Sequence, residues 1–108
     1  MWGRHYLRAY AQHSSCEIVA LVDRAKDRRA EAAAHYGIDR VFASVEELLL
    51  EVVPDIVSAI LPVKYIHEVV TACAEAGVKV VSCEKPIDYQ LARADETVQV
   101  CIDNGALF

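Results

Sequence analysis

The chain has 108 residues, of which 55% are hydrophobic and 25% are charged, so it is expected to form one packed domain and not a disordered segment. Its formal net charge of −5 disfavours nucleic acid and anionic membranes as partners, because both require a basic surface. No apolar run approaches the roughly 20 residues of a membrane span, and the N-terminus lacks the pattern of a signal peptide. We therefore expect a cytoplasmic protein with no nucleic-acid or membrane partner.

The cysteines and histidines show none of the spacings that are typical of a metal site. The cysteines lie in apolar segments, where a free thiol behaves as a small hydrophobic group: Cys16, Cys73, Cys83 and Cys101. Three histidines lie within or at the end of helical patterns and receive no role: His5, His13 and His35. The sequence predicts four reduced thiols and no metal.

Helical and strand patterns alternate along the chain. A helix is expected from the first residues, with no strand before it, and an apolar strand at 17–22 ends at Asp23. The next elements are a helix at 25–36, strand 41–43, helix 45–52, strand 55–61, helix 65–76, strand 78–83, helix 90–104 and the start of a strand at 106–108. Three helices stop at a glycine: Gly37, Gly77 and Gly105. This alternation predicts βαβ units and an α/β, doubly wound parallel sheet.

Two local patterns refine these helices. Ser44 and Glu47 have the spacing of a capping box, which predicts that a helix begins at residue 45. The last helix carries an apolar stripe that is expected to face the core: Leu91, Ala94, Val98, Cys101 and Ile102.

The strand at 78–83 leads directly into an acid, a base and a proline, Glu84, Lys85 and Pro86. In open α/β sheets, ligands bind outside the carboxyl ends of the strands, so Glu84 and Lys85 are expected to lie where a ligand binds. The alternative is a structural ion pair, with Pro86 beginning a turn.

Asp23 also follows a strand, 20 positions after Gly3. This is the offset expected between a glycine-rich turn and the acid that binds the ribose of adenosine. Only Gly3, a candidate for the last glycine of G-x-G-x-x-G, is present. The alternative is that Asp23 caps the helix that follows it.

Pro62 and His67 follow the strand at 55–61. His67 is expected near the same edge of the sheet as Asp23 and Glu84, although a first-turn histidine is more often an ordinary surface residue. Neither a G-x-S-x-G elbow nor a P-loop is present, which removes the main support for hydrolase and P-loop interpretations.

Taken in order, these segments resemble the nucleotide-binding domain of the Gfo/Idh/MocA family (glucose-fructose oxidoreductase and inositol dehydrogenase). The resemblance covers nearly the whole chain and rests on residues 17–23, 36–37, 41–49, 54–57, Pro62 with His67, and 76–86. The Glu-Lys-Pro triplet after a strand, with an upstream proline and histidine, is its most specific part.

The resemblance implies a role for each candidate residue. It implies that Asp23 binds the adenosine ribose, that Pro62 and His67 line the nicotinamide side, and that Glu84 and Lys85 face the nicotinamide ribose and the substrate. An ammonium group at Lys85 would stabilise developing negative charge and relay a proton, which makes it the catalytic candidate. The resemblance also implies that the peptide bond between Lys85 and Pro86 is a candidate for the cis isomer.

The sequence departs from the family at both ends. The family begins with a strand and two further glycines before the position of Gly3, and it continues after Phe108 with a large substrate domain. We therefore expect residues 1–108 to be an incomplete NAD(P)-binding Rossmann domain that lacks its first strand and the second domain, and to be inactive alone. We expect that the two neighbours of the missing central strand pair directly, that another chain donates a strand, or that the chain aggregates. Dinucleotide binding is expected to be weak even if the remaining elements pack, because the glycine loop normally starts from that strand.

The predicted function is that of a nucleotide-binding piece of an oxidoreductase that transfers hydride between nicotinamide and a sugar, cyclitol or related secondary alcohol. NAD is favoured over NADP because Asp23 would repel a 2′-phosphate, although the neighbouring Arg24 would offset part of that repulsion. The alternatives are a non-catalytic dinucleotide sensor of the same fold and, if the Glu-Lys-Pro match is accidental, a plain doubly wound binding domain. A homo-oligomer is compatible with the sequence.

Overall fold

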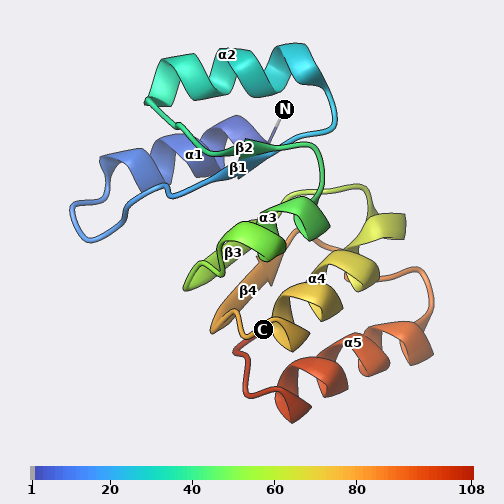
Figure 1. Ribbon diagram of the computed structural model, residues 1–108. Coiled ribbons are helices and arrows are strands. Elements are labelled where there is room, and N and C mark those ends of the chain that lie inside the picture. Colours follow the sequence, from blue (N-terminus) through green and yellow to red (C-terminus); the bar gives the residue numbers. More distant parts are fainter. Residues whose placement is uncertain (1) are drawn as a thin grey trace. The chain divides into compact units, whose positions relative to one another are not determined.

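The computed structural model describes residues 2–108, which form two compact units that divide between Glu51 and Val52. Each unit contains two parallel strands with helices packed beside them (Figure 1). None of the helices in the described residues is long and apolar enough to cross a membrane.

The first unit contains three helices and two short strands (Figure 1). They are α1 (Gly3–Gln12), β1 (Leu21–Val22), α2 (Lys26–Tyr36), β2 (Val41–Phe42) and α3 (Val45–Glu51). The two strands are parallel, with Leu21 opposite Val41 and Val22 opposite Phe42. The strand expected at 17–22 is thus confirmed only over its last two residues. In this register, residues 17–20 would lie opposite residues 37–40. Gly37 still ends α2 there, so a longer β1 would have no extended partner at its start.

Local signals correctly placed the ends of two elements in this unit. Gly37 adopts the left-handed conformation (φ 67°, ψ 38°) and its N–H is bonded to the Ala33 carbonyl oxygen, so it ends α2 as predicted. The Glu47 N–H donates to Ser44 Oγ at 3.2 Å, while a Glu47 carboxylate oxygen accepts from the Ala43 N–H at 2.9 Å. The capping box therefore forms, with the carboxylate bonded one residue earlier than in the standard arrangement.

The second unit contains the longer strands (Figure 1). Its elements are β3 (Ile56–Ala59), the 3₁₀ turn η1 (Val63–Tyr65), α4 (Ile66–Glu75), β4 (Val80–Cys83) and α5 (Leu91–Asp103). β3 and β4 are parallel, from Ile56 opposite Val80 to Ala59 opposite Cys83. Leu107 adds a parallel bridge to Val80, so the predicted start of a strand after α5 is confirmed.

The pairing in each unit follows the doubly wound order. The first unit pairs the strands that occupy positions 3 and 2 of the order 3-2-1-4-5-6, and the second unit pairs those of positions 4, 5 and 6. The parallel α/β, Rossmann-type fold is therefore confirmed. Within residues 2–108, β1 pairs with β2 in the first unit and β3 pairs with β4 in the second. What fills position 1 stays a prediction.

The core of the second unit lies between its sheet and the helices α4 and α5. Its most deeply buried side chains are Ile66, Val70, Cys73, Val78, Val81, Thr97 and Cys101. The expected stripe on α5 is partly wrong, because Leu91 is 79% exposed and Ile102 63% exposed. The buried face of α5 is centred on Thr97 and Cys101, so a threonine occupies a core position that hydrophobicity alone would assign to an apolar residue.

Candidate functional site

Asp23 follows β1, and its carboxylate is held by three hydrogen bonds. The Ala25 N–H donates to Oδ1 at 2.8 Å, which is a local turn ahead of α2. Arg28, in the first turns of α2, donates from Nη2 to Oδ1 at 2.9 Å and from Nε to Oδ2 at 3.0 Å. Asp23 therefore holds the connection that leads into α2. It does not cap the helix as the alternative proposed, because its bond reaches the N–H of the N-cap residue Ala25 and not one inside the helix.

The arginines around Asp23 favour its charged form. The hydrogen bond from Arg28 lowers the pKa of the Asp23 carboxyl below its ordinary value; burial opposes this effect, and the Ala25 N–H and the charges of Arg28 and Arg29 add to it. Arg29 also donates to the Asp23 carbonyl oxygen at 2.6 Å. Asp23 is consequently an anion at neutral pH with a quarter of its side chain exposed.

Sequence reasoning considered only Arg24 as a basic neighbour of this carboxylate and missed Arg28 and Arg29. Arg24 is exposed. One sequence pattern could have identified them: an acid at the end of a strand is followed, five and six residues later, by arginines in the first two turns of a helix. Because the connection is short and the helix turns back beside its own strand, such arginines can reach the acid.

Gly3 lies at the first position of α1, next to Trp2. A Cβ atom at Gly3 would meet nothing within 4 Å, and its φ is not positive, unlike those of Gly37, Gly77 and Gly105. Nothing in the local geometry therefore requires glycine, and a role at the end of a phosphate-binding loop stays a prediction.

In the second unit, β4 leads into Glu84 and Lys85 as expected. Glu84 is half-buried and Lys85 is exposed, and the Lys85–Pro86 peptide bond is cis, as the resemblance implied. Because Lys85 is exposed, its ammonium group is accessible to a ligand. The structural ion pair stays the alternative interpretation of these two charges.

Pro62 and His67 flank the 3₁₀ turn that begins the helical segment after β3. Pro62 is exposed and precedes that turn. His67 is half-buried, with Nδ1 at 2.8 Å from the hydroxyl oxygen of Thr97 on α5. The Thr97 hydroxyl also lies 2.9 Å from the Arg93 carbonyl oxygen, to which it donates. Because Nδ1 is engaged with Thr97, Nε2 is the ring nitrogen of His67 that is left for a ligand.

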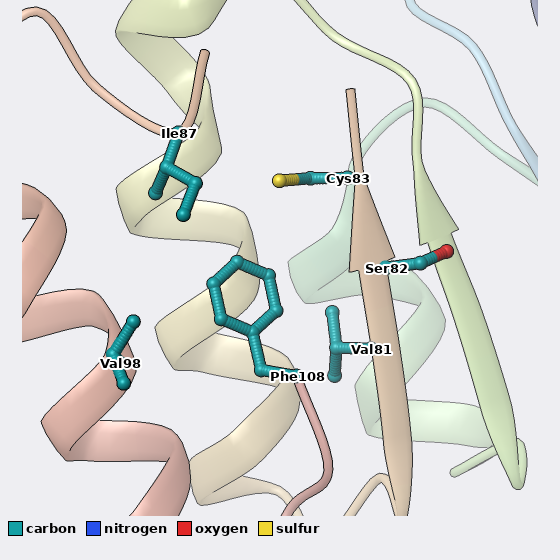
Figure 2. Close-up of a pocket in the computed structure, with 6 residues that line it drawn as sticks. All are labelled: Val81, Ser82, Cys83, Ile87, Val98 and Phe108. Atoms are coloured by element: carbon teal, nitrogen blue, oxygen red, sulfur yellow. The ribbon is translucent and has the colours of Figure 1, made fainter. Parts of the chain in front are cut away.

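A pocket of about 320 Å³ lies beside β4. Figure 2 shows Val81, Cys83, Ile87, Val98 and Phe108 around it, with the Ser82 side chain on the opposite face of the strand. Burial and the nearby Glu84 carboxylate raise the pKa of the Cys83 thiol. The thiol therefore stays protonated at neutral pH, and the lining offers neither a nucleophile nor a pair of acid and base groups.

The remaining polar groups do not suggest a metal centre. Among residues 2–108, no three His, Cys, Asp or Glu side chains are grouped so that they could hold a metal ion. None of the four cysteines, all of which lie within residues 2–108, forms a disulfide: Cys16, Cys73, Cys83 and Cys101.

Comparison with known proteins gives the same family for the whole chain. Residues 1–108 match the model of the GFO_IDH_MocA oxidoreductase family, described by its NAD-binding Rossmann fold. D-apiose dehydrogenase of Paraburkholderia graminis is 30% identical over 100 residues, which are 93% of this chain and 26% of that protein.

Solved structures resemble the fold closely. An oxidoreductase of Agrobacterium radiobacter, solved with NAD⁺, L-tartaric acid and magnesium, has a TM-score of 0.91 at 22% identity, over 97% of this chain and 30% of that one. A dehydrogenase of Bordetella pertussis, solved with NADH and UDP-GlcNAcA, has a TM-score of 0.90 at 24% identity, over 98% and 31%. The chain thus spans between a quarter and a third of the length of these relatives.

Proposed function

Because the chain belongs to the Gfo/Idh/MocA family of oxidoreductases with an NAD-binding Rossmann fold, we propose that it forms the dinucleotide-binding part of an NAD(P)-dependent oxidoreductase. The reaction is hydride transfer between nicotinamide and a sugar, cyclitol or related secondary alcohol. The 30% identity to D-apiose dehydrogenase supports a polyhydroxylated substrate. The observation that carries the proposal is the exposed Lys85 next to Glu84, directly after β4.

The residues of the first unit suit the adenosine end of the cofactor. The partly exposed, ionised Asp23 can accept hydrogen bonds from ribose hydroxyls, which is the use of such an acid in dinucleotide-binding folds. An anion at this place would repel a 2′-phosphate, and we therefore propose that NAD is the preferred cofactor. Gly3 would end the loop that approaches the pyrophosphate, and Arg24 would lie beside the ribose.

The residues of the second unit suit the reacting end. Bound nicotinamide supplies the hydride acceptor or donor. Glu84 would accept hydrogen bonds from the hydroxyls of the nicotinamide ribose, and Pro62 with the Nε2 face of His67 would border the ring. Lys85 would hold its ammonium group near the reacting oxygen, where it stabilises the negative charge that develops and passes a proton.

Lys85→Ala tests this assignment. If Lys85 acts in chemistry, the variant should lower kcat by at least about a hundredfold, as expected for a group that transfers a proton, while the Kd of NAD changes little. The matched control is Lys79→Ala, because Lys79 precedes β4, at the opposite end of the strand, and its ion pair with Asp55 is exposed on both sides.

The outcome separates the enzyme from a sensor. The measurement uses the full-length oxidoreductase of which this chain is proposed to form part. Turnover of polyols with NAD, lost in Lys85→Ala and kept in Lys79→Ala, would support the proposal. Tight NAD binding without turnover of any sugar or polyol would favour a dinucleotide sensor. Normal turnover in Lys85→Ala would remove Lys85 from the chemistry.

A further inference from the structure

Arg28 holds the Asp23 carboxylate through two nearly parallel hydrogen bonds. Its Nε donates to one carboxylate oxygen at 3.0 Å and its Nη2 to the other at 2.9 Å. This fork is the strongest common geometry for an arginine and a carboxylate. Half of the Arg28 side chain remains exposed, so the guanidinium can also be reached from solvent.

Counting acceptor sites shows that Arg28 competes with a ribose. A carboxylate offers about four lone-pair sites on its two oxygens. Oδ1 already accepts from the Ala25 N–H and from Arg28, and Oδ2 accepts from Arg28. About one site is left, on Oδ2, so Asp23 can accept both ribose hydroxyls only if at least one bond to Arg28 is displaced.

The same pair reduces the charge that a 2′-phosphate would meet. Asp23 contributes one negative charge, while Arg28 and Arg29 contribute one positive charge each, and both lower the pKa of the Asp23 carboxyl. Once displaced from Asp23, the guanidinium of Arg28 could form the same bidentate contact with phosphate oxygens. A 2′-phosphate would therefore be repelled by Asp23 and attracted by Arg28 at the same place.

Resting on the function proposed above, we propose that Arg28 sets the discrimination between NAD and NADP. Paired with Asp23, it limits the preference for NAD, and its removal leaves an uncompensated carboxylate that rejects the 2′-phosphate. Arg28→Gln should therefore raise the ratio of the Kd of NADP to that of NAD by at least about tenfold, equivalent to about 1.4 kcal/mol.

The test is calorimetric titration of NAD and NADP into the purified full-length wild-type protein, of which this chain is proposed to form part, and into three variants. The measurement therefore does not depend on activity. Arg28→Gln removes the charge and Arg28→Lys keeps it without the fork. Arg4→Gln is the matched control, because it removes one positive charge from the same unit, where Arg4 pairs with Glu31 at 2.8 Å on an exposed surface. Circular-dichroism melting checks that each variant is folded.

The expected result is a ratio that rises about tenfold in Arg28→Gln, rises less in Arg28→Lys, and changes less than about twofold in Arg4→Gln. The difference should shrink as salt is raised from about 0.01 M to 1 M, because exposed charges are screened. Equal ratios in Arg28→Gln and Arg4→Gln, with NAD still bound, would overturn the role of Arg28 and leave the proposed function standing. Wild-type protein that binds neither dinucleotide would overturn both. If Arg28→Gln does not fold, an unchanged ratio in Arg28→Lys would overturn the role of Arg28.

Discussion

In the second unit, Ile66, Val70 and Cys73 are 0% exposed, whereas the most buried apolar side chains of the first unit's described residues, Leu48 and Ile38, keep 5% and 6% exposure. Neither α1 nor α2 contains a buried residue. The surroundings of the candidate residues differ in the same way. Asp23 is held by hydrogen bonds at the surface, whereas Lys85 follows a strand that packs against the buried core. The second unit is therefore expected to supply most of the stability, and the first to depend more on polar contacts.

The largest effect should come from emptying the core of the second unit. Ile66→Ala removes a fully buried side chain and should lower the free energy of unfolding by about 2–5 kcal/mol. Leu48→Ala in the first unit should cost less, because its surroundings are less sealed and can relax. Leu50→Ala is the control, since Leu50 is 88% exposed and should change stability by no more than about 0.5 kcal/mol. If urea unfolding shows that Ile66→Ala and Leu48→Ala lower the free energy of unfolding equally, the second unit does not supply more of the stability than the first.

A smaller effect is expected from the polar centre of the same core. Thr97→Val keeps the shape of a fully buried residue and removes the hydroxyl that bonds His67 Nδ1. A fully buried polar group left without a partner costs about 1–3 kcal/mol, and we expect about 1 kcal/mol here because His67 is half-buried.

Thr71→Val is the matched control for that change. The Thr71 hydroxyl donates to the backbone carbonyl of His67 at 2.7 Å, an oxygen within α4 that the helix can also satisfy. Unfolding curves that coincide for the two variants would mean that the contact between His67 and Thr97 adds nothing to the second unit.

These elements show which features can be predicted from the sequence. The last residue of α2 and the first residue of α3 were predicted correctly. Gly37 ends α2, and Ser44 with Glu47 begins α3, through hydrogen bonds that join residues close in the sequence. The length of β1 was not predicted correctly, because a strand extends only as far as the partner strand with which it pairs.

The same limit applies to the sites. The buried face of α5 depends on packing against α4, so Thr97 could not be distinguished from the exposed Leu91 by its pattern. The cis bond before Pro86 was predicted because the triplet resembles a family motif. The roles of Glu84 and Lys85 rest on the same motif and stay predictions. Arg28 was missed because its contact with Asp23 depends on the conformation of the connection between β1 and α2.

The smallest expected effect concerns pH and the first unit. Arg28 lowers the pKa of Asp23 in the folded protein below its ordinary value of 3.8, so this carboxyl stabilises the fold above pH 3.8. That contribution is lost as the pH falls through the lower, folded pKa. Arg28→Gln should move the folded pKa upward and weaken the dependence of stability on pH below about 5. Carbon-13 NMR titration of the Asp23 carboxyl measures the shift, and an unchanged pKa would mean that the pair does not persist in solution.

The most direct test of the assignment of Asp23 to adenosine, and of Glu84 and Lys85 to nicotinamide, uses the two halves of the cofactor separately. In nitrogen-15 NMR spectra of the purified protein, AMP should shift the amide signals of Asp23, Arg24 and Ala25, because Asp23 is assigned to the adenosine ribose. Nicotinamide mononucleotide should instead shift those of Glu84 and Lys85. If both halves perturb the same residues, or neither perturbs these two segments, the assignment of Asp23 to adenosine and of Glu84 and Lys85 to nicotinamide is contradicted.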